Sequence, residues 1–220
     1  MTQVGPGAEM PSANDASLQT WQASWDSAWS ALGASAPPPV LAELLQSYSE
    51  PQRHYHTLQH LGEAMGLLQP ALGLAAHPGE VALALWFHDA VYETQAKDNE
   101  ARSADWAVAV VRGQGLPAEV AGRVHGLIMA TCHAAQPSGI DAQLLVDADL
   151  GILAADPLRF SEYELQVRAE YEWVPLPLYR AKRREVLQGF MQREAIYCTD
   201  WFRQRLEVRA RRNLAQALGL

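Results

Sequence analysis

The sequence predicts an all-α protein, a single-domain bundle of roughly nine or ten helices. Apolar residues recur at helical spacing over nearly the whole chain. Trp21, Trp25 and Trp29, for example, lie four residues apart and share one helix face. No segment combines an alternating apolar–polar pattern with turn residues on both sides, as a half-buried strand would. We expect the three tryptophans to pack in the core.

Proline and glycine residues divide the chain into the expected helices. Pro37-Pro38-Pro39 ends the first, which carries the tryptophans. Asp98 or Asn99 follows a loop at 93–97 and can cap a helix, as can Asp200, because a side-chain oxygen satisfies free backbone N–H groups. The expected later helices cover 40–48, 56–69, 79–92, 98–111, 117–132, 140–154, a segment from 156, 175–193 and 200–218.

Length and composition indicate one soluble globular domain. The chain has 220 residues and is 49% hydrophobic, which is enough for a substantial core. Residues 1–15, rich in Gly, Pro, Ser and Asn, are expected to form a disordered leader, and 16–220 the domain. The leader lacks the features of a secretory signal, and the apolar run 81–87 is far short of the ~20 residues of a membrane span. We therefore expect a cytoplasmic protein.

Charge and cysteine content argue against two classes of protein. The formal net charge of -8 disfavours binding to a nucleic-acid backbone. Cys132 and Cys198 form no CxxC pair, so two free thiols are expected rather than a zinc knuckle or a disulfide. Near the C-terminus, arginines flank an apolar stripe, which we interpret as a solvated basic face over packed residues rather than a nucleic-acid patch. The arginines are Arg203, Arg205, Arg209, Arg211 and Arg212, and the stripe is Phe202, Leu206, Ala210 and Leu214.

His88-Asp89 at the end of the run 81–87 is the most informative feature of the chain. Ionisable groups in a buried segment are costly unless they are paired or bind a metal. His56 and His60 lie upstream, four residues apart on an expected helix, so their side chains project from one face. Downstream, an expected apolar helix contains Asp147 and Asp149. Side chains two residues apart on a helix point in nearly opposite directions, so only one of these carboxylates is expected to bind an ion directly.

This order of residues resembles the HD superfamily of metal-dependent phosphohydrolases, named for its His-Asp doublet. The match runs from His60 through His88-Asp89 to Asp149, and the string 53–60 resembles the entry helix of cyclic-nucleotide phosphodiesterases. The segments 86–92, 99–104 and 209–214 resemble a bacterial branch of predicted HD phosphohydrolases, and that resemblance covers about residues 20–218. The family implies four metal ligands, His60, His88, Asp89 and Asp149.

The resemblance also implies roles for nearby residues. His56 matches the phosphodiesterase histidine that protonates the leaving oxygen. His133 is a candidate further ligand or substrate contact, and His125 a poorer one. Asp147 or Glu93 is expected to orient the attacking water. Arg53 is a candidate clamp for phosphate oxygens, with a solvated cation at a helix start as the equal alternative.

Two imidazoles and two carboxylates form a borderline nitrogen–oxygen site that suits Mn, Fe, Ni, Co, Zn or Mg. The expected reaction is metal-assisted hydrolysis of a small phosphorylated substrate such as a phosphomonoester, a phosphodiester or a nucleotide. Three alternatives stay open: a sensor that binds metal and nucleotide without turnover, a helical interaction protein, and a di-iron oxygenase. Four aromatic residues, Tyr163, Tyr171, Trp173 and Tyr179, are expected to pack in the core. The sequence leaves the oligomeric state open.

Overall fold

The computed structural model describes residues 13–133 and 135–220, with side chains from Leu18 onward. In these ranges the protein is all-helical, with ten α-helices, two 3-10 helices and no strand, as the sequence predicts. Most of the expected leader, residues 1–12, lies outside the described residues. The remainder of it, 13–15, belongs to the first helix.

The helices alternate with short connections along the chain. They are α1 (Ala13–Ala31), α2 (Pro38–Ser47), α3 (Leu58–Leu68), η1 (Gln69–Leu74), α4 (Pro78–Phe87), α5 (Asn99–Gly113), α6 (Ala118–Ala130), α7 (Ile140–Asp149), η2 (Leu150–Ala154), α8 (Pro157–Glu170), α9 (Leu176–Met191) and α10 (Asp200–Leu218).

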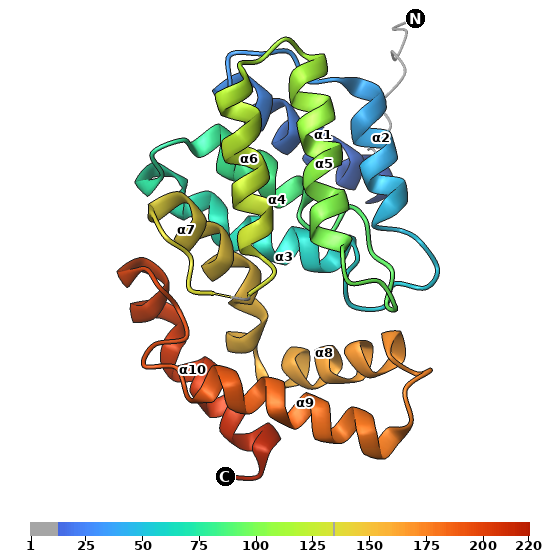
Figure 1. Ribbon diagram of the computed structural model, residues 1–220, viewed down its shortest axis with the longest axis vertical. Helices are drawn as coiled ribbons and strands as arrows, with labels where there is room; N and C mark the ends of the chain where they lie inside the picture. Colours follow the sequence, from blue (N-terminus) through green and yellow to red (C-terminus); the bar gives the residue numbers. More distant parts are fainter. Residues whose placement is uncertain (1–12, 134) are drawn as a thin grey trace, which may run out of the picture.

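Helix α4 lies at the centre of the larger part of the molecule, which α1 to α7 form (Figure 1). Nearly all of its side chains are buried, and it packs against α1, α3, α5, α6 and α7. A helix that is apolar all round is stable only when neighbours cover every face. The end of α4 therefore lies deep in the bundle, and this places His88-Asp89 in the interior.

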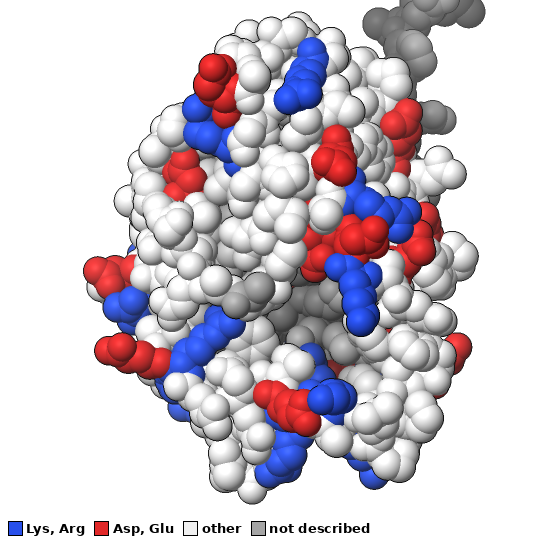
Figure 2. All heavy atoms as spheres, viewed as in Figure 1, with Lys and Arg blue, Asp and Glu red and all other residues white. Residues whose placement is uncertain are grey.

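The remaining helices, α8 to α10, form the lower part of the molecule in Figure 1. Helix α10 packs against η2 and α9. Its apolar stripe of Phe202, Leu206, Ala210 and Leu214 is buried, which confirms that the stripe packs in the core. Several C-terminal arginines bind local groups, since Arg211 pairs with Glu207. On the face shown in Figure 2, cationic and anionic side chains are interspersed.

Several expected boundaries are wrong by up to five residues. Helix α4 ends at Phe87 rather than 92, so His88-Asp89 forms a turn after the helix. Helix α3 begins at Leu58, so His56 precedes it and does not share a helix face with His60. The chain also stays helical through Pro70, in η1, because proline is tolerated in the first turn of a helix.

The expected caps also differ. Asp98 precedes α5 but makes no side-chain capping bond, whereas the amide of Asn99 binds the backbone N–H and C=O of Glu93. Thr199 rather than Asp200 caps α10, because its hydroxyl accepts a hydrogen bond from the N–H of Phe202.

The aromatic residues mostly pack as expected. Trp25 and Trp29 are completely buried, while Trp21 is partly buried and packs edge-to-face on Trp86. Tyr163 is buried, but Trp173 is 51% exposed in the turn between α8 and α9, contrary to the expectation for the core. None of the described helices has the length and apolarity needed to cross a bilayer.

Trp25→Ala should lower the free energy of unfolding by about 3–5 kcal/mol, because it leaves a cavity among Trp29, Trp86 and Phe87. Trp173→Ala is the matched control, and it should change stability by less than about 0.5 kcal/mol because the ring is exposed. Denaturant titration measures both. Equal losses in the two variants would contradict the assignment of Trp25 to the core.

Candidate metal centre

Three helices bring together the four residues that the family resemblance marks as ligands. His60 lies in the first turn of α3, His88 directly follows α4, and Asp149 is the last residue of α7. Asp89 is next to His88. Because α3, α4 and α7 pack against one another, these side chains meet in the interior. We call His60, His88, Asp89 and Asp149 the histidine–aspartate cluster.

The atoms of this cluster have the spacing of ligands around one ion. His60 Nε2 and His88 Nε2 are 3.1 Å apart. Asp149 Oδ1 lies 3.3 Å from His60 Nε2 and 3.6 Å from His88 Nε2. Asp89 Oδ2 lies 3.0 Å from His88 Nε2 and 3.5 Å from His60 Nε2. Ligands at right angles, each about 2.1 Å from a six-coordinate ion, are about 3.0 Å apart. The group of His60, His88 and Asp149 can thus hold a metal ion.

Hydrogen bonds at the outer ring nitrogens, Nδ1 of His60 and of His88, fix the orientation of both imidazoles. His88 Nδ1 lies 2.8 Å from the carbonyl oxygen of Leu85, which only accepts, so Nδ1 carries a proton. His60 Nδ1 lies 3.0 Å from the hydroxyl of Tyr55. In its neutral form His88 therefore turns the lone pair of Nε2 toward the cluster. Such partners on the outer nitrogen are typical of metal-binding histidines.

The charges of the cluster reinforce one another. Burial by itself lowers the pKa of both imidazoles, but hydrogen bonds and charge from Asp89 and Asp149 outweigh it. The pKa of His60 is raised, and that of His88 is raised well above its usual value. Burial raises the pKa of both carboxyls, yet the imidazoles hold each of them well below its usual range. The protein thus concentrates two carboxylates and two basic nitrogens that a cation can bind once protons leave.

His133 joins the cluster from the loop after α6. Its Nε2 lies 3.1 Å from Asp149 Oδ2, the carboxylate oxygen that does not face His60. Its φ of 54° is in the left-handed region, which non-glycine residues rarely adopt. Its Nδ1 is buried and has no hydrogen-bond partner among the residues that the structure describes. The structure therefore places His133 at the centre. Its role as a ligand or substrate contact stays a prediction.

His56 lies beside the cluster, and its orientation is tightly held. Its Nδ1 is 2.8 Å from Glu170 Oε2, and its ring stacks on Tyr92 with centroids 4.1 Å apart. The ring centroids of His56 and His60 are 6.0 Å apart. Nε2 of His56 thus remains available on a partly exposed ring, and the charge of His56 helps to lower the pKa of Asp89.

Glu170 at the end of α8 is a functional candidate that the sequence did not reveal. One of its oxygens accepts hydrogen bonds from the backbone N–H groups of His54, Tyr55 and His56, and the other from the hydroxyl of Tyr92. Burial raises the pKa of Glu170, but its bonds to His56 and to the backbone lower it to about 2. A separation of 114 residues from His56 left no local pattern by which to find it.

Arg53 does not serve as a phosphate clamp, because its donors are already engaged. The guanidinium is buried and donates to Glu50 and to the carbonyl oxygens of His56, Asp89 and Ala90. The expectation of a clamp is therefore wrong, and so is the alternative of a solvated cation. Arg53 instead joins the segment before α3 to the turn after α4.

Asp147 is also placed differently from the prediction that it orients water. It is completely buried and accepts hydrogen bonds from the N–H groups of Cys198 and Thr199 and from the hydroxyl of Thr199. Burial raises the pKa of Asp147 more than these bonds lower it. As expected for residues two apart on a helix, Asp147 and Asp149 point to different surroundings, and Asp147 anchors the start of α10.

Two further candidates lie at the surface. Glu93 pairs with Arg102 at 2.8 Å, and its role in orienting water stays a prediction. His125 lies on the surface of α6, 4.0 Å from Asp105. The preference for His133 over His125 thus agrees with where the two histidines lie.

A cavity of about 340 Å³ adjoins the cluster, and His60 and Asp149 line it together with Arg159 and Arg209. Glu63 pairs with Arg159 inside this cavity. Its volume lies in the range of sites for small organic ligands. Figure 2 shows a hollow in the surface between the two parts of the molecule.

Comparison with known proteins adds no family to this geometry. No family model, no curated protein and no solved structure matches the chain. The side chains of the centre are therefore the basis for its chemistry.

Metal binding should release protons at neutral pH. The pKa values of His60 and His88 are raised, so a proton between their Nε2 atoms must leave before both nitrogens can bind an ion. We expect release of about one to two protons per ion and an affinity that rises with pH. Calorimetry with Mn²⁺ in two buffers of different ionisation enthalpy measures this number. A binding enthalpy that is the same in both buffers would refute it.

Asp147→Ala and Asp149→Asn should separate stability from metal binding. Asp147→Ala leaves buried N–H groups of Cys198 and Thr199 without an acceptor and should cost about 2–4 kcal/mol. That variant should still bind metal, whereas Asp149→Asn should fold and lose it. Denaturant titration and elemental analysis give the two readouts. Loss of metal from a folded Asp147→Ala variant would contradict the separate roles.

Proposed function

We propose that this protein is a metal-dependent phosphohydrolase of the HD superfamily that acts on a small phosphorylated substrate. The observation that carries the proposal is the meeting of His60, His88, Asp89 and Asp149 at ligand distances, next to a histidine held by a carboxylate. The order of these residues along the chain is that of the HD motif, and the all-helical fold agrees with it.

The four residues of the cluster would hold one divalent ion of the group Mn, Fe, Ni, Co, Zn or Mg. When bound, this ion lowers the pKa of a coordinated water and draws charge from a phosphoryl oxygen. The outer hydrogen bonds of His60 and His88 keep their Nε2 atoms directed at the ion's position.

His56 is the group suited to donate a proton to the departing oxygen. Glu170 binds Nδ1 and so fixes which nitrogen faces outward. Tyr92 packs against the ring and binds the same carboxylate. A histidine–carboxylate pair of this kind orients the imidazole while leaving Nε2 free for proton transfer.

The alternatives account for less of the geometry. An interaction protein would gain nothing from two buried imidazole nitrogens that face each other at 3.1 Å. A di-iron oxygenase would need two more ligands, yet His125 lies on the surface and Glu170 holds His56, which leaves only His133 beside Asp149. A sensor that binds metal and nucleotide would use the same cluster, so turnover is the distinguishing measurement.

Protein purified without chelators should contain about one divalent ion per chain and should hydrolyse some members of a panel of phosphoesters and nucleotides with added Mn²⁺. Asp89→Ala should lose metal and activity together. His56→Ala should keep the metal and lose about 10²–10⁴-fold in turnover, as for a removed general acid. Binding of panel compounds without turnover would favour the sensor, and metal-free protein would refute the proposal.

A further inference from the structure

Glu100 differs from the other acidic residues of the chain. Its side chain is half-buried, yet none of the hydrogen bonds and ion pairs among the described residues engages its carboxylate. Every other buried or half-buried carboxylate in the described ranges has a partner, as Glu80 has in Arg123 and Glu164 in Arg183. The oxygens of Glu100 are not among the buried atoms without a partner, so they are open to solvent and to a ligand.

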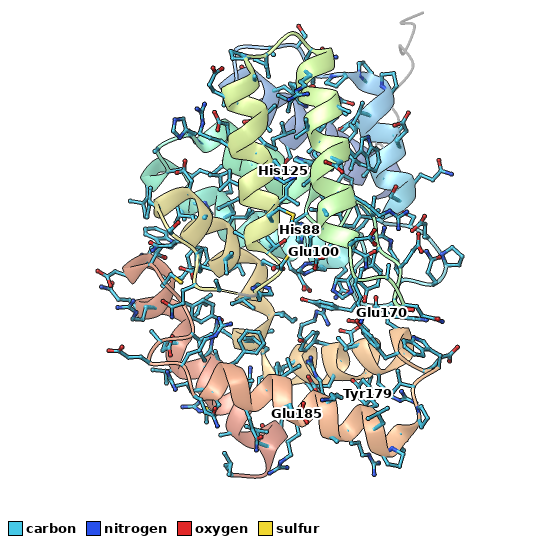
Figure 3. All side chains as sticks on the ribbon, in the orientation of Figure 1. His88, Glu100, His125, Glu170, Tyr179 and Glu185 are labelled. Atoms are coloured by element: carbon cyan, nitrogen blue, oxygen red, sulfur yellow. The ribbon has the colours of Figure 1, made fainter. Side chains whose placement is uncertain are left out.

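The start of α5 directs Glu100 toward the turn that carries Asp89. The fully buried hydroxyl of Ser103 accepts a hydrogen bond from the N–H of Val91, two residues after Asp89. Residues three apart on a helix are neighbours on one face, so Glu100 projects on the side of Ser103. Figure 3 labels Glu100, in the first turn of α5, and His88, directly after α4.

The charge of Glu100 also acts on the loop that carries His133. Burial raises the pKa of the Cys132 thiol, and the charge of Glu100 raises it further. Cys132 immediately precedes His133, whose Nε2 is 3.1 Å from Asp149. The first turns of α5 thus contact the turn after α4 through Ser103, and the charge of Glu100 acts on the loop after α6 through Cys132.

We propose that Glu100 is the catalytic carboxylate that accepts a proton from the attacking water. This inference rests on the proposed phosphohydrolase function, and it gives Glu100 a role for which Asp147, buried and bound by Cys198 and Thr199, is not available. As the water oxygen bonds to phosphorus, one water proton passes to Glu100. The bond from phosphorus to the leaving oxygen breaks, and His56 gives that oxygen its proton. Transfer of the proton from Glu100 to His56 through solvent restores both groups.

The two proton-transfer groups come from separate elements, and they differ in their partners. Glu170 fixes His56 from α8, whereas Glu100 extends from α5 with both carboxylate oxygens unbound. A donor needs an anion beside it to hold its proton, and an acceptor needs free lone pairs. The contrast between a fully bound Glu170 and a free Glu100 matches these two requirements.

Glu100→Gln should lower turnover by about 10²–10⁴-fold and leave the metal content unchanged. The matched control is Glu119→Gln, which makes the same change in the first turn of α6 at an exposed position and should keep wild-type turnover. In Glu100→Ala, added formate should restore part of the activity, because it can enter the space left by the carboxylate. A Glu100→Gln variant with wild-type turnover or without metal would overturn the role of Glu100.

Binding of inorganic phosphate to the Mn²⁺-loaded protein gives a readout that does not need turnover. Removing the negative charge in Glu100→Gln should tighten phosphate binding about tenfold, whereas Glu119→Gln should leave it unchanged. If Glu100 only stabilised the start of α5, its variant would lose stability with unchanged phosphate affinity, and the inference would fail. A wild-type protein that neither binds phosphate nor hydrolyses any ester would instead refute the proposed function itself.

Discussion

Two imidazole nitrogens, His60 Nε2 and His88 Nε2, face each other at 3.1 Å in the interior of the protein, with a carboxylate on either side. Lone pairs in this arrangement repel unless a proton or a cation lies between them. Helices α3 and α4 pack together, and Tyr55 and Leu85 bind the outer nitrogens of the two rings. The position of both rings is therefore fixed. Hydrogen bonds around the cluster hold the two rings in this unfavourable arrangement.

The supporting interactions come from segments far apart in the chain. Arg53 fixes the turn after α4 through the carbonyl oxygens of Asp89 and Ala90. Glu170 gathers three consecutive N–H groups before α3 and orients His56. Both charged groups are buried and compensated by hydrogen bonds, which is the condition under which such burial is stable. A geometry held in this way before any ligand arrives is the usual basis of catalysis by preorganised groups.

The sequence predicted the fold class from local helical periodicity, and the family resemblance directed attention to the residues that the fold brings together. The helical periodicity correctly predicted α1, whose Trp25 and Trp29 are buried. The order of the motif residues indicated His60, His88 and Asp149, which lie together in the structure. Helix ends were less predictable, since tertiary contacts end α4 at Phe87 and leave His56 outside α3. The roles of Arg53, Asp147 and Glu170 depend on partners 36, 51 and 114 residues away, and no local pattern records such contacts.

Helix α7 carries two carboxylates near its C-terminal end, and each of them binds a different part of the protein. Asp149 belongs to the cluster, while Asp147 receives the first turn of α10. Each carboxylate is bound on its own side of the helix, by the imidazoles of the cluster or by the N–H groups of Cys198 and Thr199. One short segment of α7 therefore joins the interior of the bundle to the start of the last helix, and a substitution at either carboxylate leaves the partners of the other in place.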